Sequence, residues 1–338
     1  MKSAILQSLT VVAVLCGSSP AAVRHVPGEY ATIQAAINDC SDGDIIIVGP
    51  GLYLERIDFL GKDITVTGAD PNDPAVVAGT IINAGGVGSA VKFMNGETRD
   101  AVLSGFTITG GYGTLYMDEE GLFWGGGIFC AEASPTIVKN VIVNNNGPAT
   151  ADPQAISYGG GIACFMSDAL IQNNIIADNT AAAGAGVIIY FGDAIITDNL
   201  IYGNSGVIGG GVVLLGGELT NNTIVGNDVS LPSDLGGPIA GNVYAASDNV
   251  SLLFQARVVN NIICGAKSGG GLFHQDVAED AIAFNDVWGN TPANYVMRDP
   301  VTYEPIYDGP ADRTGAYGNI SRNPLFVNSA QNDYHLAA

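Results

Sequence analysis

Two carboxylates stand at equivalent places in neighbouring stretches of the sequence and could bind a cation. Asp168 and Asp193 are 25 residues apart, which is also the shortest spacing between the glycine triplets of the chain. If each repeat is one coil of a stacked structure, their side chains lie about 5 Å apart. Like charges at that distance repel unless they are solvated, protonated or bridged by a cation. Calcium is therefore the cofactor to consider, beside the simpler interpretation of two solvated turn residues; no other cofactor is expected.

Aromatic side chains form a second candidate site, which suits a carbohydrate. Alternation along the strand after each glycine triplet predicts an outward apolar stripe made of Phe129, Ala163, Ile188, Val213, Tyr244 and Phe273, with Phe165, Tyr190 and Leu215 two residues later. Such a stripe marks a surface that is either covered or binds a partner. The rings expected to stack on sugars are those of Tyr116, Trp124, Phe129, Tyr158, Phe165 and Tyr190. Loops that fold over the stripe and bury it are the alternative.

Catalytic bases are scarce where the repeats are clearest. Between residues 125 and 290 the basic residues are Lys139, Arg257 and Lys267, and the single histidine is His274, on an inward position. Elimination or epimerisation on a uronate needs a base and a group that neutralises the carboxylate. The sequence therefore assigns no catalytic residue and favours a non-catalytic protein. If the protein is an enzyme, a polysaccharide lyase is expected.

Two cysteines occupy the same position in adjacent repeats. Cys130 and Cys164 are 34 residues apart, as are the glycine triplets before them, so both are predicted to face inward on neighbouring coils. Their expected Cα separation lies within the disulfide range of roughly 4.4–6.8 Å. A disulfide and a reduced buried pair both fit, because cysteine is among the most buried residue types.

The elements that position these residues come from a repeat. Glycine-rich triplets begin at Gly125, Gly159, Gly184, Gly209, Ala240 and Gly269, with spacings of 34, 25, 25, 31 and 29 residues. Two rows of asparagine run in step with them, namely Asn140, Asn174, Asn199, Asn222, Asn261 and Asn285, and Asn145, Asn179, Asn204, Asn227 and Asn290. Each unit is a set of short β-branched strands joined by turns. A variable period with a floor near 25 predicts a parallel β-helix, with asparagines that tolerate left-handed turns and stack along the axis.

Domain boundaries follow from the ends of the chain. Residues 1–21 are predicted to be a signal peptide, with Lys2, an apolar run and small residues before the cleavage point. Cys16 suggests a lipoprotein signal instead, although Leu15 does not suit one. Residues 22–338 are predicted to form one β-helix domain. It contains a capping helix over 30–39, early strands near 45–48, 64–67 and 81–82, the clearest repeats over 125–290, and a terminal coil over 291–338 that a longer natural chain could continue.

Composition limits the partners. The 338 residues include 46 glycines, 47% are hydrophobic, and 33 acidic residues outnumber 12 Lys and Arg, for a formal net charge of −21. The apolar content excludes disorder for most of the chain, and the acidity argues against nucleic acid. After the leader, no stretch is long and apolar enough to span a membrane. A secreted or cell-surface location is expected.

Several segments resemble a known superfamily. Residues 30–68 and 102–111, the GGGI-x-C segments at Gly125 and Gly159, and NDVWGN near the end are similar to secreted bacterial right-handed parallel β-helix proteins of the pectin-lyase-like superfamily. The resemblance implies an all-β, right-handed parallel β-helix. It says little about activity, because the superfamily holds lyases, esterases, hydrolases, epimerases and non-catalytic surface proteins.

Loop lengths complete the functional hypothesis. Long insertions at 112–124, 146–158 and 228–239 fall at one corner of the coil, which predicts a groove with the coils of 184–226 as its floor; random variation of loop length is the alternative. The first hypothesis is an exported, non-catalytic β-helix of the surface that binds carbohydrate in this groove. A polysaccharide-active enzyme, most simply a lyase, and a rigid adhesin or spacer are the alternatives.

Overall fold

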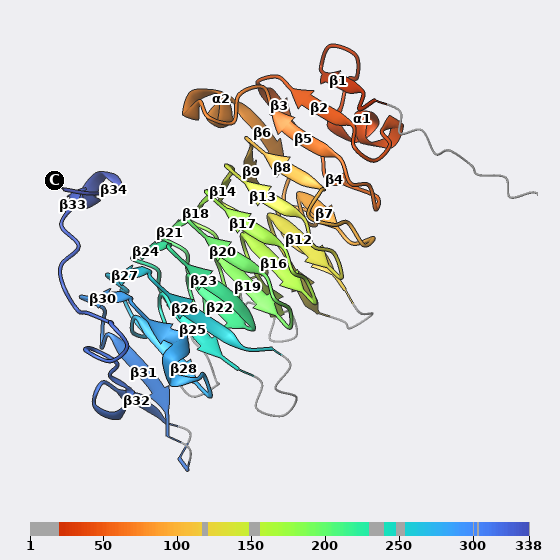
Figure 1. The fold of residues 1–338 in the computed structure, drawn as a ribbon. Coiled ribbons are helices and arrows are strands. Elements are labelled where there is room, and N and C mark those ends of the chain that lie inside the picture. Colours follow the sequence, from red (N-terminus) through yellow and green to blue (C-terminus); the bar gives the residue numbers. More distant parts are fainter. Residues whose placement is uncertain are drawn as a thin grey trace, which may run out of the picture.

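The computed structural model describes residues 20–116, 121–148, 156–229, 240–247, 254–299, 301–302 and 304–337. Most of the predicted signal peptide, residues 1–19, lies outside them. The chain winds into successive coils whose strands stack along one axis, so that three long parallel sheets run the length of the molecule (Figure 1). The predicted parallel β-helix is confirmed.

Sheet A has ten strands in the described residues. In stacking order they are β1 (Val23–Val26), β2 (Ile45–Val48), β5 (Thr65–Gly68), β8 (Val102–Ser104), β13 (Thr136–Val138), β17 (Leu170–Gln172), β20 (Ile195–Thr197), β23 (Gly217–Thr220), β26 (Ala256–Val259) and β29 (Ile282–Ala283). The strand predicted at 45–48 is β2, and that predicted at 64–67 is β5, one residue later.

Sheet B has nine described strands and follows sheet A around each coil. They are β3 (Gly51–Tyr53), β6 (Thr80–Asn83), β9 (Thr107–Thr109), β14 (Val141–Val143), β18 (Ile175–Ala177), β21 (Leu200–Tyr202), β24 (Thr223–Val225), β27 (Ile262–Cys264) and β30 (Asp286–Trp288). The strand predicted at 81–82 is the middle of β6.

Sheet C closes each coil with ten described strands. They are β4 (Ile57–Asp58), β7 (Val91–Phe93), β12 (Ile128–Ala131), β16 (Ile162–Phe165), β19 (Val187–Tyr190), β22 (Val212–Leu215), β25 (Val243–Ala246), β28 (Leu272–Gln275), β31 (Tyr295–Arg298) and the antiparallel edge strand β32 (Pro305–Tyr307). A small fourth sheet, sheet D, is built from the long insertions: β10 (Thr114–Leu115), β11 (Leu122–Trp124) and β15 (Ile156–Tyr158).

The corner between sheets A and B is held by the first predicted asparagine row. The residue before each buried asparagine has left-handed backbone, with φ of 58° at Lys139 and 57° at Asp198. The buried amides then bond from coil to coil: Asn174 Nδ2 donates to Asn199 Oδ1 over 3.1 Å, and Asn199 Nδ2 donates to Asn222 Oδ1 over 3.0 Å. These bonds satisfy polar groups that the core would otherwise leave unpaired, which confirms the structural interpretation of the row.

The second row contains one exchange that the sequence pattern hides. Asn227 Nδ2 donates to Asn242 Oδ1 over 2.9 Å, and Asn242 Nδ2 donates to Asn290 Oδ1 over 2.9 Å. Asn242 is the third residue of a glycine-rich triplet, and the expected place in the row is taken by Ala266. In a regular coil a Cβ at Gly211 would lie 2.9 Å from Asn227 Nδ2. Two residue pairs can therefore fill the same volume. One coil uses Gly211 with Asn227, and the next uses Asn242 with Ala266.

The predicted capping helix is α1 (Ile33–Asp39), with Ile33 and Ile37 buried against the core. Thr32 is its N-cap, and the Glu55 carboxylate accepts hydrogen bonds from the Ile33 and Gln34 amides at 2.9 and 3.0 Å. Carboxylates stabilise a helix N-terminus in this way. Glu55 therefore has a structural role, because it holds the capping helix on the first coil. A second short helix, α2 (Pro74–Gly79), was not expected.

The described part of the terminal region is less regular than a coil. It contains the 3₁₀ turns η1 (Glu279–Ala281), η2 (Gly309–Ala311) and η3 (Ser329–Gln331), and the hairpin of β33 (Phe326–Asn328) and β34 (Asp333–Leu336). The hairpin turns back towards sheet B, where the Tyr334 and Tyr202 ring centroids are 5.6 Å apart (Figure 1). Asn319 extends the first asparagine row by one step, because its Oδ1 accepts from the Asn285 amide over 2.9 Å.

Candidate ligand cleft on the outer face of sheet C

The outward row of sheet C is in register along the molecule. Strand pairing aligns, in order, Asp58, Lys92, Phe129, Ala163, Ile188, Val213, Tyr244 and Phe273. The predicted apolar stripe therefore exists as one row, and it continues towards the N-terminus as two charged residues. The apolar part of this row and its charged N-terminal end have different surroundings.

The middle of the stripe is covered. Phe129, Phe165 and Trp124 are buried in a second hydrophobic cluster outside the main core. The Trp124 ring, carried by sheet D, stacks on Tyr158 with centroids 4.5 Å apart and meets Tyr190 edge-on at 5.4 Å. The structure thus supports the interpretation in which the loops bury the stripe. Trp124, Phe129 and Phe165 are not available to a ligand.

Three of the aromatic candidates lie at the rim of this cluster. Tyr116, Tyr158 and Tyr190 are half-buried. The Tyr116 hydroxyl donates to Glu132 Oε1 over 3.2 Å, and burial raises the pKa of Tyr116. Much of the predicted groove wall, residues 149–155 and 230–239, lies outside the described residues. The structure places a cleft on the other side of the 112–124 insertion.

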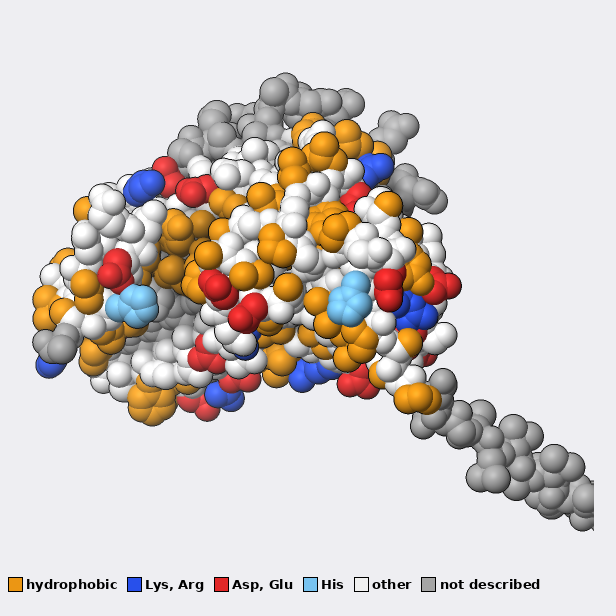
Figure 2. All heavy atoms as spheres, turned by 90° about the horizontal axis from the view of Figure 1, so that it is seen from above, with side chains coloured by type: hydrophobic (Ala, Val, Ile, Leu, Met, Phe, Trp, Pro, Cys, Tyr) orange, Lys and Arg blue, Asp and Glu red, His pale blue; other side chains and the backbone are white. Residues whose placement is uncertain are grey.

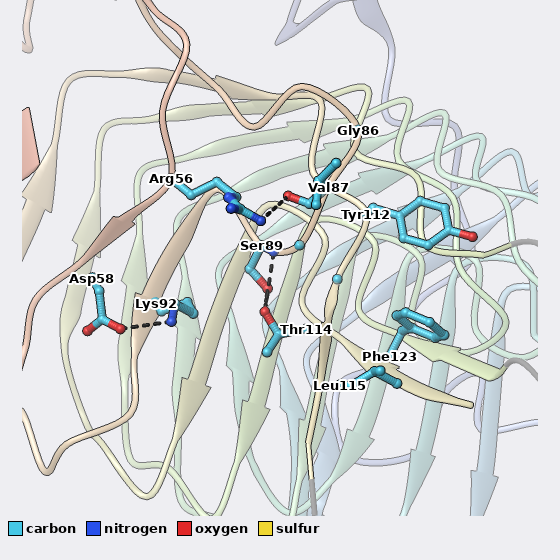
Figure 3. Close-up of a pocket in the computed structure, with 12 residues that line it drawn as sticks. Arg56, Asp58, Gly86, Val87, Ser89, Lys92, Tyr112, Thr114, Leu115 and Phe123 are labelled. Atoms are coloured by element: carbon cyan, nitrogen blue, oxygen red, sulfur yellow. Dashed lines mark hydrogen bonds and ion pairs between the residues drawn. The ribbon is translucent and has the colours of Figure 1, made fainter. Parts of the chain in front are cut away.

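That cleft has a volume of about 720 Å³, within the range of ligand pockets. Its floor is the N-terminal end of sheet C, and its walls are the loop before β7 and the beginning of the 112–124 insertion (Figure 3). It is lined by Arg56, Asp58, Gly86, Val87, Gly88, Ser89, Lys92, Tyr112, Gly113, Thr114, Leu115 and Phe123.

One side of the cleft is charged. Lys92 Nζ lies 2.8 Å from Asp58 Oδ2, an ion pair between neighbouring strands of the floor. Arg56 Nη1 donates to the Val87 carbonyl over 3.3 Å, which holds the guanidinium over the cleft, while the side chain stays exposed (Figure 3). A guanidinium held at one edge keeps its other N–H groups for a carboxylate or hydroxyl of a ligand.

The other side is aromatic. The Tyr112 and Phe123 rings meet edge-to-face with centroids 5.5 Å apart, and Tyr112 is 39% exposed. Between the two sides, buried Ser89 Oγ is 2.8 Å from Thr114 Oγ1 and donates to the Trp124 carbonyl over 3.1 Å. These bonds fix the insertion to the floor, so the cleft is formed before any ligand arrives.

The calcium candidates take part in the turns. Asp168 Oδ1 accepts from the Asp193 amide over 2.8 Å, and the Asp168 amide donates to Ser134 Oγ over 3.0 Å. The Asp168 carbonyl accepts two bonds from the Arg99 guanidinium at 3.1 and 3.0 Å. Among the residues that the structure describes, no group of three or more His, Cys, Asp and Glu is arranged to hold a metal ion.

The cysteine pair and His274 face the core. Cys130 and Cys164 are adjacent in register, fully buried and present as free thiols, and burial raises the pKa of Cys130. His274 is buried as predicted; its Nε2 lies 2.8 Å from the Ala311 carbonyl, and burial lowers its pKa. Burial removes all three side chains from any surface chemistry.

The cleft residues Arg56, Lys92, Tyr112 and Phe123 were missed by sequence reasoning, which looked for cations between residues 125 and 290. The strand containing Lys92 follows Gly88-Ser89-Ala90, in the place of a glycine triplet. That weak match would have extended the repeat back to Lys92. Figure 2 shows basic and acidic side chains interspersed over the face drawn, in a chain with 12 Lys and Arg against 33 acidic residues.

Comparison with known proteins agrees with this architecture. A cell surface glycoprotein of the archaeon Methanothermus fervidus is 35% identical over 122 residues, which are 35% of this chain and 19% of that relative. No helix in the described residues is long and apolar enough to cross a membrane. A model of the right-handed β-helix region matches residues 79–263. Since this match spans more than half of the chain, the protein belongs to the right-handed β-helix family.

Proposed function

We propose that the protein is an exported β-helix of the cell surface that binds an acidic carbohydrate without converting it. The observation that carries the proposal is the cleft with a charged side and an aromatic side. Arg56 and Lys92 suit carboxylate groups of a uronate, and the exposed Tyr112 ring suits the apolar face of a sugar. The matched relative, named a cell surface glycoprotein, supports the surface location.

Binding fits the cleft better than turnover. Among its lining residues the titratable side chains are Arg56, Asp58, Lys92 and Tyr112. Lys92 is already paired with Asp58 at 2.8 Å. A general base must reach the proton that it removes, and the ion pair directs the Lys92 ammonium along the floor of the cleft.

A polysaccharide lyase is the second candidate. Arg56 and Lys92 place two basic side chains on one cleft. A lyase would use one as the base and the other to neutralise the uronate carboxylate. The resemblance of the sequence to the pectin-lyase-like superfamily supports this alternative.

Retardation in gels that contain uronate-rich or neutral polysaccharides tests the proposal, with and without Ca²⁺. We expect uronate-rich gels to retard the protein, and Arg56→Ala and Tyr112→Ala each to weaken binding by tenfold or more. Lys267→Ala, which removes an exposed cation outside the cleft, is the matched control and should change binding less than twofold.

Four results would revise this proposal. Equal retardation of the cleft variants and the control would show that the cleft is not the site. Unsaturated products from a uronate polymer would make the protein a lyase. No retardation by any polysaccharide would favour the rigid spacer. Retardation that needs Ca²⁺ and is lost in Asp193→Asn would support the calcium candidates.

A further inference from the structure

Three exposed asparagines share one position in the corner between sheets A and B. Asn173, Asn221 and Asn260 each precede a buried row asparagine, and their φ angles are 55°, 59° and 57°. All three have the left-handed backbone that asparagine tolerates. Their backbone and burial are thus the same, and any difference in chemistry must come from the neighbouring sequence.

The neighbouring sequence singles out Asn221. It begins Asn221-Asn222-Thr223, whereas Asn173 and Asn260 each have isoleucine two residues later. Asn-x-Ser/Thr is the acceptor motif for N-linked sugars in exported proteins. The Asn221 Oδ1 accepts from Asn260 Nδ2 over 2.7 Å. Among the hydrogen bonds of the described residues, Asn221 Nδ2 donates none. This nitrogen, to which a sugar would be attached, is therefore free.

A second acceptor motif shows what a structural asparagine looks like. Asn319-Ile320-Ser321 has the same pattern, but Asn319 is 1% exposed. Its Nδ2 donates to the carbonyls of Ile282 and Ala316 over 2.7 and 2.8 Å, and its Oδ1 accepts from Asn285. A third motif, at Asn249, lies outside the described residues.

We propose that Asn221 carries an N-linked oligosaccharide and that Asn319 does not. The inference rests on the surface location proposed above. An oligosaccharide carried on a polyprenyl phosphate is the donor. A bond forms between Asn221 Nδ2 and the anomeric carbon, the bond from that carbon to the phosphate oxygen breaks, the lipid phosphate leaves with the electron pair, and one amide proton passes to a base of the transferase.

The order of transfer and folding does not change the outcome at Asn319. In the folded chain its amide is buried. If transfer comes first, a sugar on Asn319 Nδ2 has no room in the core and breaks the bonds to Ile282 and Ala316, so those chains do not complete the last coil. At Asn221 the sugar projects from the corner between sheets A and B. The cleft lies on sheet C, so it stays open.

The test uses the protein purified from the organism that encodes it. Cell fractionation gives its location, and intact mass followed by mass spectrometry of proteolytic fragments gives the modified residue. We expect a carbohydrate mass on fragments with Asn221 and none on fragments with Asn173, Asn260 or Asn319. Asn221→Gln and Thr223→Val should remove the mass. Thr223→Ser keeps the motif and Asn260→Gln removes only the neighbouring bond, so both should retain it.

The outcomes separate this inference from the proposed function. Unmodified Asn221 in protein recovered from the surface overturns the inference and leaves the surface role intact. Sugar on Asn319 in folded protein also overturns it. Protein confined to the cytoplasm overturns the surface location on which the inference rests. Loss of polysaccharide binding in Arg56→Ala is scored on its own, because the cleft is on a different sheet.

Discussion

The coils before Gly125 and those from Gly125 to Asn290 use the same three sheets but are held together by different chemistry. In the later coils, buried amides stack from coil to coil, and the outer face of sheet C is covered by aromatic side chains. In the earlier coils, close ion pairs join neighbouring coils, such as Arg24 with Asp44 at 2.6 Å and Lys92 with Asp58 at 2.8 Å. The ion pair described between later strands, Arg257 with Glu218, is longer at 3.8 Å and more exposed.

This difference shows that stacked amides require coils of equal shape. An amide row needs equal corners in successive coils, because each amide bonds both to the coil before it and to the coil after it. The row ends at the coil of β9, where the Phe106 and Gly111 amides donate to Asn140 and Asn145. Beyond that point the corners vary, and the amide rows do not continue. The cleft that contains Arg56 and Lys92 lies among these variable coils.

The largest expected effect is the loss of one row amide. Asn199→Ala removes the donor to the carbonyls of Ile171 and Thr197 and the acceptor of the Asn174 amide. The bonds to Ile171 and Asn174 are buried, and the bond to Thr197 is partly buried. We expect unfolding to become easier by about 3 kcal/mol, because buried polar groups are left unpaired. Guanidinium titration followed by circular dichroism measures it. Gln172→Ala removes one exposed bond to Asp198 and should cost less than about 0.5 kcal/mol; equal losses would show that the row is not stabilising.

The exchange between Asn242 and Ala266 gives the next largest effect. Asn242→Gly removes the acceptor of the buried Asn227 backbone amide, and Asn227 Nδ2 and the Cys264 carbonyl each lose one of their bonds. We expect a loss of about 2 kcal/mol. Ala266→Asn alone overfills the same volume. The double variant restores the arrangement of the other coils and should recover most of the stability. A double-mutant cycle measures this coupling, and additive losses would contradict the proposed exchange.

A smaller effect should appear on acidification, and first in the coils near the N-terminus. The Ser41 and Ala22 amides and the Arg24 guanidinium hold the pKa of Asp44 below its ordinary value. A lowered folded pKa gives stability that is present above the unfolded value of about 3.9 and is lost as pH falls through the folded value. The asparagine amides do not titrate in this range.

Hydrogen exchange between pH 5 and pH 2.5, corrected for the intrinsic rate, measures that difference. We expect protection of β1 and β2 to fall before that of β17 and β20. Asp44→Asn should weaken the first two strands already at pH 7 and flatten their pH dependence. Simultaneous loss of protection in both regions would mean that the coils unfold as one unit and that their chemistry does not separate them.

The smallest effect on stability is expected in the cleft. Lys92→Met breaks a partly exposed ion pair, which contributes at most about 1 kcal/mol. The proposed function predicts that the same change weakens polysaccharide binding by tenfold or more. Thermal unfolding and gel retardation on the same preparation compare the two. Unfolding of the variant at 25 °C would show that Lys92 is a structural residue of the floor.

Much of the repeat could be predicted locally, whereas the cleft could not. The asparagine rows and the strands between them follow from turn chemistry and from alternation along a few residues. Which part of the outer stripe is exposed depends on where the 112–124 insertion lies, and loop length does not give its direction. Trp124 and Tyr158 therefore pointed to a sugar site in the sequence, and the structure stacks them on each other instead.

The sequence by itself determined the stacked coil, its inward residues and its asparagine corners, because each coil repeats the same local pattern and a shared core rewards equal coils. Only the tertiary structure decided that Lys92 lies in register with Asp58 and lines one cleft with Arg56. It also decided that Asn242 supplies the amide that the row lacks at Ala266, and that Asn221 is exposed while Asn319 is buried. The residues joined in this way are at least 24 positions apart in the sequence. The two glycosylation motifs that differ in burial lie in different coils. They depend on register and on packing between coils, which no short stretch of sequence contains.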